Sequence, residues 1–346
     1  MARDGCVDGA WPSLILVKRM GNVPSLDVVI VNWNAGEFLA RCLQSIQGTA
    51  REDVEVRRVV VVDNASSDGS GRDLNFPGLP LQVVSNTLNR GFAVACNQGA
   101  RGTSAEYLLF LNPDVRLQLD SLRIPLRFME DPVNGRIGIC GIQLLDESGH
   151  VSRTCSWFPT GASVLWQMLG LDRLFPRIFR GHFLKECEHQ ESATVDQVMG
   201  AFLLIRRALF EALGGFDERF FVYYEDLDLS YRAKRCGWSS YYLASTQAWH
   251  KGCGCSDQVR DIRLFYSLRS RILYAYKHFS RSAATLVLLG TILLEPFSRL
   301  AWAGLTGSLA GMRETVKGYA MLWRALPSMV AVARRERWHV HSMGTD

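Results

Sequence analysis

Short β-branched runs that each end in a cluster of polar residues are the feature that most constrains this chain. Asp27-Val-Val-Ile-Val31 is apolar over almost its whole length, which is typical of a strand buried on both faces of a parallel sheet. Similar runs alternate with helical patterns: strands at 58–63, 81–85 and 107–111, and helices at Glu37–Gln47 and Asn89–Ala100. This spacing predicts a mostly parallel α/β sheet of the Rossmann-like kind.

The second half of the chain continues the pattern less regularly. The expected elements are strands at 138–141, 200–206 and 237–243, and helices at 207–213 and Phe220–Arg235. The stretch 138–194 contains no motif that indicates a function.

Charge divides the chain near residue 260. Residues 261–346 contain 12 Lys/Arg against 5 Asp/Glu, and residues 1–260 contain 27 against 29. We therefore expect three parts: a poorly ordered N-terminal extension at 1–26, a catalytic domain at 27–260, and a basic, apolar helical tail at 261–346. The longest apolar run, Ser282–Leu294, falls short of the ~20 residues of a spanning helix.

A basic and apolar tail indicates an anionic membrane surface as partner rather than nucleic acid, for which no binding signature is present. The alternative is a helical subdomain that packs on the core or on a second copy of the chain, so a homo-oligomer stays possible. The nine cysteines are odd in number and form no regular framework, which favours a reducing, cytoplasmic compartment. Cys253 and Cys255 lie near His250 but lack a second pair at finger spacing, so we expect no structural zinc site.

Carboxylates follow several of the predicted strands. No G-x-G-x-x-G follows the first strand and no G-x-x-x-x-G-K-[ST] occurs, which argues against a dinucleotide dehydrogenase and a P-loop NTPase. Asp63, Asp114 and the pair Glu225-Asp226 stand at strand ends or loop–helix junctions, where α/β sheets bind ligands. One such carboxylate with a distant His could hold Mg²⁺ or Mn²⁺ beside a diphosphate, and another could deprotonate a hydroxyl.

The order of the motifs resembles family 2 of the inverting glycosyltransferases, which have the GT-A fold, in its rhamnosyltransferase-like branch. The matching segments, between about 27 and 256, are Val29–Asn34, Val62–Gly69, Asn89–Ala93, Phe110–Asp114, Gly200–Arg207, Gly214–Glu218, Phe221–Asp228 and Trp249–Gly252. The first position of the family's D-x-D signature is here Asn112.

The resemblance implies a role for each matching residue. Asp226 would be the base that deprotonates the acceptor hydroxyl, and Glu225 would orient the base or the acceptor. Asp114 and His250 would bind a divalent cation, Mn²⁺ or Mg²⁺. The nucleotide-sugar donor would contact Val31, Asn32, Trp33, Asn34, Asp63, Asn64, Ser66, Asp68, Asn89, Gly91, Phe92, Asn112, Gly200 and Ala201.

The implied activity is transfer of one sugar, or a few, from a pyrimidine nucleotide, with dTDP-L-rhamnose the best single expectation. The acceptor would be a lipid-linked or cell-surface glycan, met at the inner face of the cell membrane by a peripheral enzyme. The Q-x-x-R-W signature of processive synthases is missing. Two other classes stay open: a nucleotidyltransferase of similar fold, and a non-catalytic module that binds nucleotide or glycan.

Overall fold

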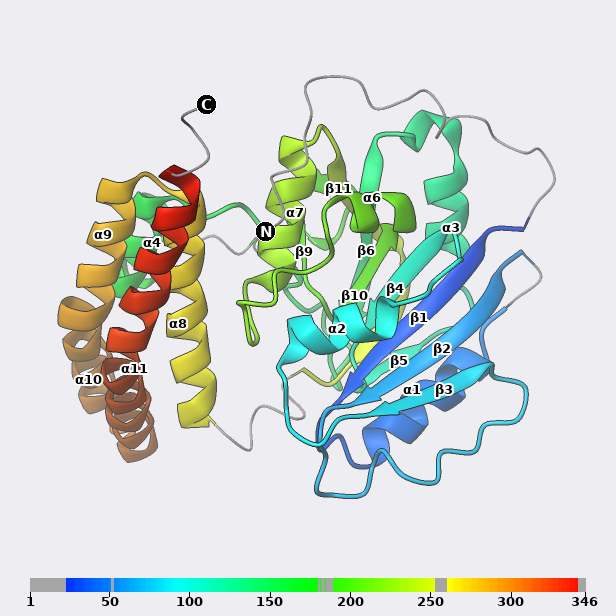
Figure 1. Ribbon diagram of the computed structural model, residues 1–346, viewed down its shortest axis with the longest axis horizontal. Coiled ribbons are helices and arrows are strands. Elements are labelled where there is room, and N and C mark those ends of the chain that lie inside the picture. Colours follow the sequence, from blue (N-terminus) through cyan, green and yellow to red (C-terminus); the bar gives the residue numbers. More distant parts are fainter. Residues whose placement is uncertain are drawn as a thin grey trace. The chain divides into compact units, whose positions relative to one another are not determined.

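The computed structural model describes residues 23–50, 53–179, 181, 184, 189–252 and 260–341. The contacts divide the chain into two units. One unit comprises residues 1–159 and 182–255, and the other comprises 160–181 and 256–346. Below they are called the sheet unit and the helical unit (Figure 1). The extension expected at 1–26 lies almost wholly outside the described residues, which begin at Val23.

A single large sheet forms the centre of the sheet unit. Its strands run in the order β3-β2-β1-β4-β10-β6-β11-β5, with β8 beside β11. Their bounds are β1 Ser25–Asn32, β2 Glu55–Asp63, β3 Leu81–Ser85, β4 Tyr107–Leu111, β5 Val115–Leu117, β6 Ile137–Leu145, β8 Ala193–Val195, β10 Phe202–Arg206 and β11 Ser239–His250. Two short strands, β7 at Cys155–Ser156 and β9 at Gln197–Val198, pair separately.

The first four strands are parallel, as predicted, but the sheet as a whole is mixed. Strand β1 pairs in parallel with β2 and β4, and β2 pairs in parallel with β3. Strand β10 enters antiparallel between β4 and β6. Because of this reversal, Phe202 at the start of β10 pairs with Leu111 at the end of β4. The segment before β10 therefore reaches the edge where the parallel strands end.

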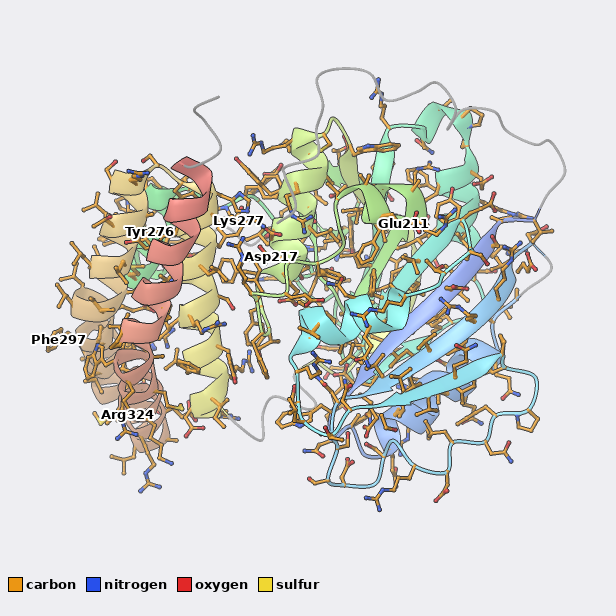
Figure 2. The ribbon with its side chains drawn as sticks, in the orientation of Figure 1. Glu211, Asp217, Tyr276, Lys277, Phe297 and Arg324 are labelled. Atoms are coloured by element: carbon orange, nitrogen blue, oxygen red, sulfur yellow. The ribbon has the colours of Figure 1, made fainter. Side chains whose placement is uncertain are left out.

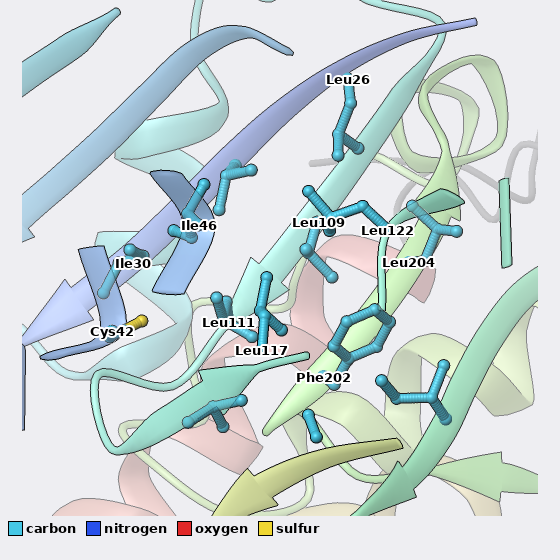
Figure 3. Close-up of a cluster of buried hydrophobic side chains, with 14 of the residues drawn as sticks. Leu26, Ile30, Cys42, Ile46, Leu109, Leu111, Leu117, Leu122, Phe202 and Leu204 are labelled. Atoms are coloured by element: carbon cyan, nitrogen blue, oxygen red, sulfur yellow. The ribbon is translucent and has the colours of Figure 1, made fainter. Parts of the chain in front are cut away.

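Both faces of the sheet are covered, which explains why the strands read as continuous apolar runs. Val28 and Ile30 of β1 face one cluster with helices α1 (Glu37–Gln47) and α3 (Arg123–Glu130), part of which is drawn in Figure 3. Val29 and Val31 face the other cluster with α2 (Phe92–Ala100), α6 (Arg207–Ala212) and α7 (Glu225–Arg235). Alternate residues of a strand point to opposite faces, so a strand between two helical layers has no polar side.

The helical unit contains more than the tail. Its helices are α4 (Gly161–Met168), α5 (Leu171–Leu174), α8 (Arg260–His278), α9 (Arg281–Leu289), α10 (Glu295–Leu305) and α11 (Leu309–His341), with a π-helical turn at Gly290–Leu294. Val164 and Met168 of α4 pack with Ala284 and Val287 of α9. The sequence interpretation assigned 27–260 to one domain, whereas the contacts group residues 160–181 with the C-terminal helices.

The apolar run Ser282–Leu294 belongs to a helix that is longer than the run itself. A continuous helix runs over 25 residues, Arg281–Leu305, and is long and apolar enough to cross a membrane by length and composition. The run Ser282–Leu294 alone is shorter than a spanning helix, as predicted, but the helix that contains it reaches that length because it continues through Glu295. That carboxylate is buried in ion pairs with Arg271 and Arg299.

One smaller expectation also needs correction. Helix α7 begins at Glu225 and not at Phe220, because Tyr223 and Tyr224 have φ values of 68° and 69°. Among the described cysteines, Cys42, Cys96, Cys140 and Cys155 are buried and free, and Cys236 is disulfide-bonded.

Packing of α2 on the sheet leads to the first testable prediction. A Cβ at Gly99 would lie 2.5 Å from Cγ1 of Val29 and 3.1 Å from Cγ2 of Val62. We expect Gly99→Ala to lower the free energy of unfolding by about 1–3 kcal/mol, because the strands must shift. Urea unfolding would measure this.

The matched control is Gly48→Ala. There the new Cβ would meet nothing closer than 3.6 Å, at an ordinary φ of −83°. Its stability should change by no more than about 0.5 kcal/mol. Equal losses in the two variants would contradict the tight contact between α2 and the sheet.

Candidate active site

The carboxyl ends of β1 and β2 hold the first group of predicted site residues. Asn32 and Asp63 are register partners in the two strands. The Asn32 side chain is fully buried and donates from Nδ2 to Asp63 Oδ1 at 2.8 Å, with Ser66 Oγ at 3.1 Å and Ser70 Oγ at 2.9 Å also in reach. This amide fixes the carboxylate of Asp63 at the rim of the sheet. Val31 is buried inside β1, and Trp33 is half-buried in the next loop.

The loops after the same two strands are joined by Asn34 and Asp68. Asn34 has a φ of 51°, which Asn tolerates better than most residues. Its Oδ1 accepts the Ser67 N–H at 2.7 Å, and the Gly36 N–H donates to Asp68 Oδ2 at 2.8 Å. Desolvation alone would raise the pKa of Asp68, but hydrogen bonds from Ser70 and from the Gly36 amide hold that pKa below its ordinary value. An ionised carboxylate thus braces this loop.

Asn64 and Asn89 connect the loop after β2 to the start of α2. Asn64 is 2% exposed, and its Nδ2 donates to Asn89 Oδ1 at 2.8 Å and to the Gly91 carbonyl at 3.2 Å. Its Oδ1 accepts from Asn86 and from the Arg90 amide. Both the oxygen and the nitrogen of the Asn64 side chain are therefore already hydrogen-bonded within the protein. In this structure Asn64 acts by holding the neighbouring loops in place.

Helix α2 begins against the loop that precedes α7. The Phe92 N–H donates to the Phe221 carbonyl at 2.6 Å. Gly91 has a φ of 89°, and a Cβ there would lie 2.5 Å from the same oxygen. Only glycine permits both the backbone angle and this close approach.

Asp114 and His250 face each other at the far side of the same edge. Asp114 precedes β5, His250 ends β11, and the two strands pair next to them. His250 Nε2 lies 3.4 Å from Asp114 Oδ1, and the side chains are only 8% and 5% exposed. His250 Nε2 is buried and makes no hydrogen bond. A buried imidazole nitrogen beside a carboxylate oxygen fits a divalent cation that both could bind.

Within the described residues no cluster of three or more His, Cys, Asp or Glu side chains could hold a metal. A cation held by Asp114 and His250 alone would have two protein ligands and open positions for phosphate oxygens and water, as Mg²⁺ and Mn²⁺ commonly do. The two side chains line a hollow together with Arg116, Glu147 and Lys251. Cys253 and Cys255 lie outside the described residues.

The reversed strand β10 brings Gly200 and Ala201 to this edge. The N–H of Asn112, two residues before Asp114, donates to the Ala201 carbonyl at 3.0 Å. The Gly200 N–H donates to Asp226 Oδ2 at 2.8 Å. One short segment therefore links the loop that carries the predicted metal ligand to the carboxylate predicted as base.

Asp226 is held from both sides in the first turn of α7. Oδ2 also accepts from Gln197 Nε2 at 3.0 Å, and Oδ1 accepts the Leu227 N–H at 2.8 Å. The Ser156 hydroxyl bonds Gln197 Oε1 at 2.6 Å, which turns the Gln197 amide nitrogen toward Asp226. Sequence reasoning missed Gln197 and Ser156, since nothing in Val195–Met199 marks a side chain that reaches a helix 29 positions later.

Three acidic residues, Glu225, Asp226 and Asp228, occupy the first turn of α7, where the helix dipole favours negative charge. Asp228 is fully buried and paired with Arg232, whose other nitrogens donate to the carbonyls of Leu213 and Gly215. Glu225 is 5% exposed, and its Oε2 makes no hydrogen bond.

Burial changes the acidity of both predicted catalytic carboxyls. Desolvation, followed by the charge of Asp226, raises the pKa of Glu225 well above its ordinary value. Desolvation also raises the pKa of Asp226, although the hydrogen bonds from Gly200, Leu227 and Gln197 act in the opposite direction. A raised pKa makes a carboxylate a stronger base, provided that it is ionised at the working pH.

Comparison with known proteins places this arrangement in a family. The model of glycosyl transferase family 2 matches residues 27–214, more than half of the chain. The chain belongs to glycosyl transferase family 2. It is therefore a glycosyltransferase. This excludes the two other classes that the sequence left open, a nucleotidyltransferase and a non-catalytic module that binds nucleotide or glycan.

Three curated relatives of this family 2 glycosyltransferase are named as sugar transferases. It is 28% identical over 242 residues to the N-acetylglucosaminyl-diphospho-decaprenol L-rhamnosyltransferase of Mycobacterium tuberculosis, covering 65% of this chain and 75% of that protein. It is 25% identical to the rhamnosyltransferase WbbL of Escherichia coli, over 64% of this chain and 82% of that one. The hexosyltransferase Agl10 of Haloferax volcanii is 26% identical over 74% of this chain and 77% of its own length.

Solved structures confirm the GT-A fold class of the glycosyltransferase. The mannosyltransferase PcManGT of Pyrobaculum calidifontis, solved with GDP-Man and Mn²⁺, has a TM-score of 0.52 at 20% identity. The alignment covers 92% of this chain and 88% of that one. At this level of identity the likeness establishes the fold alone.

The buried Glu225 carboxyl leads to the second prediction. Its pKa is raised in the folded state, so the folded state binds more protons than the unfolded state, and stability falls as the pH rises above the ordinary Glu value. We expect Glu225→Gln to be more stable than the natural protein at about pH 8 and to lose this advantage as the pH falls towards 4.5, the ordinary Glu pKa. Urea unfolding across this pH range would measure the difference.

The control is Glu37→Gln, which removes an exposed carboxylate paired with Arg41. As an exposed surface change, it should alter the free energy of unfolding by no more than about 0.5 kcal/mol. A Glu225→Gln variant that is less stable than the natural protein at pH 8 would contradict the raised pKa, because it would show that the Glu225 anion is stabilising.

Proposed function

We propose that this glycosyltransferase is a metal-dependent inverting enzyme that transfers L-rhamnose from dTDP-L-rhamnose to a lipid-linked glycan. The observation that carries the catalytic part is Asp226, a carboxylate held by Gly200 and Gln197 beside the edge where the strands end. The sugar and the acceptor are proposed from the relatives, two of which are named rhamnosyltransferases and one of which is named for a diphospho-decaprenol substrate.

Asp226 would accept the proton of the acceptor hydroxyl while that oxygen attacks the anomeric carbon. Its hydrogen bonds come from Gln197 and from backbone amides on either side, so the carboxylate is oriented before the acceptor binds. Glu225 precedes it, buried and with a raised pKa. If Glu225 is protonated, Asp226 is the only one of these two carboxyl groups that carries a negative charge.

Asp114 and His250 would hold the divalent cation, Mn²⁺ or Mg²⁺. When bound, such a cation offsets the negative charge that develops on a leaving diphosphate. A phosphate leaving group needs no proton, so a single base suffices. The donor nucleotide would lie over the ends of β1 and β2, where Asn32, Asn34 and Asp63 form the rim.

For the location we propose the cytoplasmic face of the cell membrane, reached through the helical unit. The supports are the basic excess of residues 261–346 and the lipid-linked substrate in the name of the mycobacterial relative.

Nucleotide and metal preference can be tested without knowing the acceptor. Thermal unfolding of the purified protein would be followed with dTDP, UDP and GDP, each with Mn²⁺ or EDTA. A ligand that binds only the folded state adds about 2.7 kcal/mol at about a hundredfold excess over Kd. We expect stabilisation by dTDP that requires Mn²⁺ and is lost in Asp114→Ala.

The control for that experiment is Asp120→Ala, which removes a partly exposed carboxylate paired with Arg123. This variant should keep the shift. Stabilisation that is equal in EDTA would contradict the metal site, and stabilisation by GDP alone would contradict the pyrimidine donor.

The base role is tested by Asp226→Asn, which keeps the shape of the side chain and removes its basicity. Sugar transfer should fall by at least about a hundredfold, whereas the thermal shift with dTDP and Mn²⁺ should remain. Asp120→Asn makes the same chemical change away from the site and should retain activity. Undiminished transfer by Asp226→Asn would remove this residue from the base role.

A further inference from the structure

The long helix formed by α9, the π-helical turn and α10 exposes apolar side chains over most of its length. Phe297 is 71% exposed and projects outward from the helical unit (Figure 2). The exposed apolar residues of this helix are Leu286, Leu289, Leu293, Leu294, Phe297, Trp302 and Leu305. From Ser282 to Leu294 the sequence contains no charged residue. Continuous apolar surfaces of this kind mark interaction sites.

The only acidic residue of the same helix, Glu295, points the other way, whereas its arginines, Arg281 and Arg299, are exposed. Glu295 is 4% exposed and lies between Arg271 of α8 and Arg299, with which it forms ion pairs. Arg271 also donates to Thr291 Oγ1 at 3.0 Å. A helix of a water-soluble domain has the opposite arrangement, with apolar residues inside and charges outside. Here the Glu295 carboxylate is inside the unit with Arg271, whereas leucines face outward.

One side of this helix stays covered by protein. Helix α8 packs against α9, and α11 packs against α10 and α8. A third of the most apolar 18-residue window is buried. Lipid could therefore reach only the outer face, which is the geometry of a helix that lies in the membrane interface and does not cross the bilayer.

The helical unit also has an excess of positive charge. Residues 261–346 have an excess of seven basic residues. Arg313, Lys317 and Arg324 of α11 are exposed, and Trp302 and Trp323 expose aromatic rings of the kind found at the headgroup level. This charge complements an anionic lipid surface.

We propose that the outer face of the helix Arg281–Leu305 inserts into the boundary between headgroups and acyl chains of an anionic lipid bilayer. This inference deepens the proposed membrane location and rests on it. In this proposal the protein is attached by leucine and phenylalanine side chains buried in the lipid, and not by basic side chains alone. Salt screens charge attraction but does not weaken apolar burial, so the attachment should persist at high salt.

Flotation of the purified full-length protein tests the proposal. The probe is a vesicle of equal parts phosphatidylcholine and phosphatidylglycerol, at about 0.1 M and about 1 M NaCl. We expect the natural protein to float with the vesicles at both salt concentrations. The double variant Leu293→Gln/Phe297→Gln should lose binding by at least about tenfold. Because both side chains are more than half exposed, this variant should fold normally.

The matched control is Val133→Gln, which makes the same apolar-to-polar change at an 89% exposed position of the sheet unit. It should bind vesicles like the natural protein. The helical content and the nucleotide-induced thermal shift of each variant serve as folding checks. Flotation needs neither donor nor acceptor, so a failure of the proposed transfer reaction and a failure of membrane insertion give separate results.

Two outcomes would overturn the proposal. Release of the natural protein in 1 M NaCl, with unchanged binding by the double variant, would assign attachment to basic side chains alone. A dimer in light scattering that the double variant converts to a monomer, without loss of flotation, would assign the face to a second copy of the chain.

Discussion

The reversed direction of β10 is the constraint on which the site depends. Parallel strands bring only their carboxyl ends to one edge, so an all-parallel sheet would send the start of every strand to the opposite edge. Because β10 is antiparallel to β4, Gly200 and Ala201 stand at the edge where β1, β2 and β4 end. One backbone amide of this segment reaches Asp226, and the next carbonyl receives the amide of Asn112. A single reversal thus connects the two halves of the site.

Local sequence determines much of this fold. The strands Leu81–Ser85 and Tyr107–Leu111 have the bounds that their apolar runs predict. The fold class follows from the same alternation, since both faces of the sheet are covered. The start of α7 could not be predicted from propensity, because Tyr223 and Tyr224 take left-handed conformations that cost energy and are held by their surroundings.

For the site, the sequence pointed to residues whose type indicates chemistry, and missed those whose role is to hold them. Asp114 and His250 are 136 positions apart in the sequence and meet because β5 pairs with β11. Gln197 has no local signal, and its role depends on a contact across the fold. Asn64 belongs to a strong motif, but its hydrogen bonds go to neighbouring loops. A motif therefore shows where a site lies, but it does not show which of its residues contact the ligand and which hold the others in place.

The membership of α4 in the helical unit has a consequence for how the chain folds during synthesis. Val164 and Met168 find their apolar partners in α9, which begins at Arg281. At a synthesis rate of about 5–20 residues per second, α4 leaves the ribosome roughly 6–24 seconds before those partners. During that interval its apolar side is without cover, although the sheet that surrounds it in sequence is already being completed. The helical unit therefore closes last, after both of its separated segments have emerged, and a chain cut near residue 260 would leave α4 without the surface it packs on.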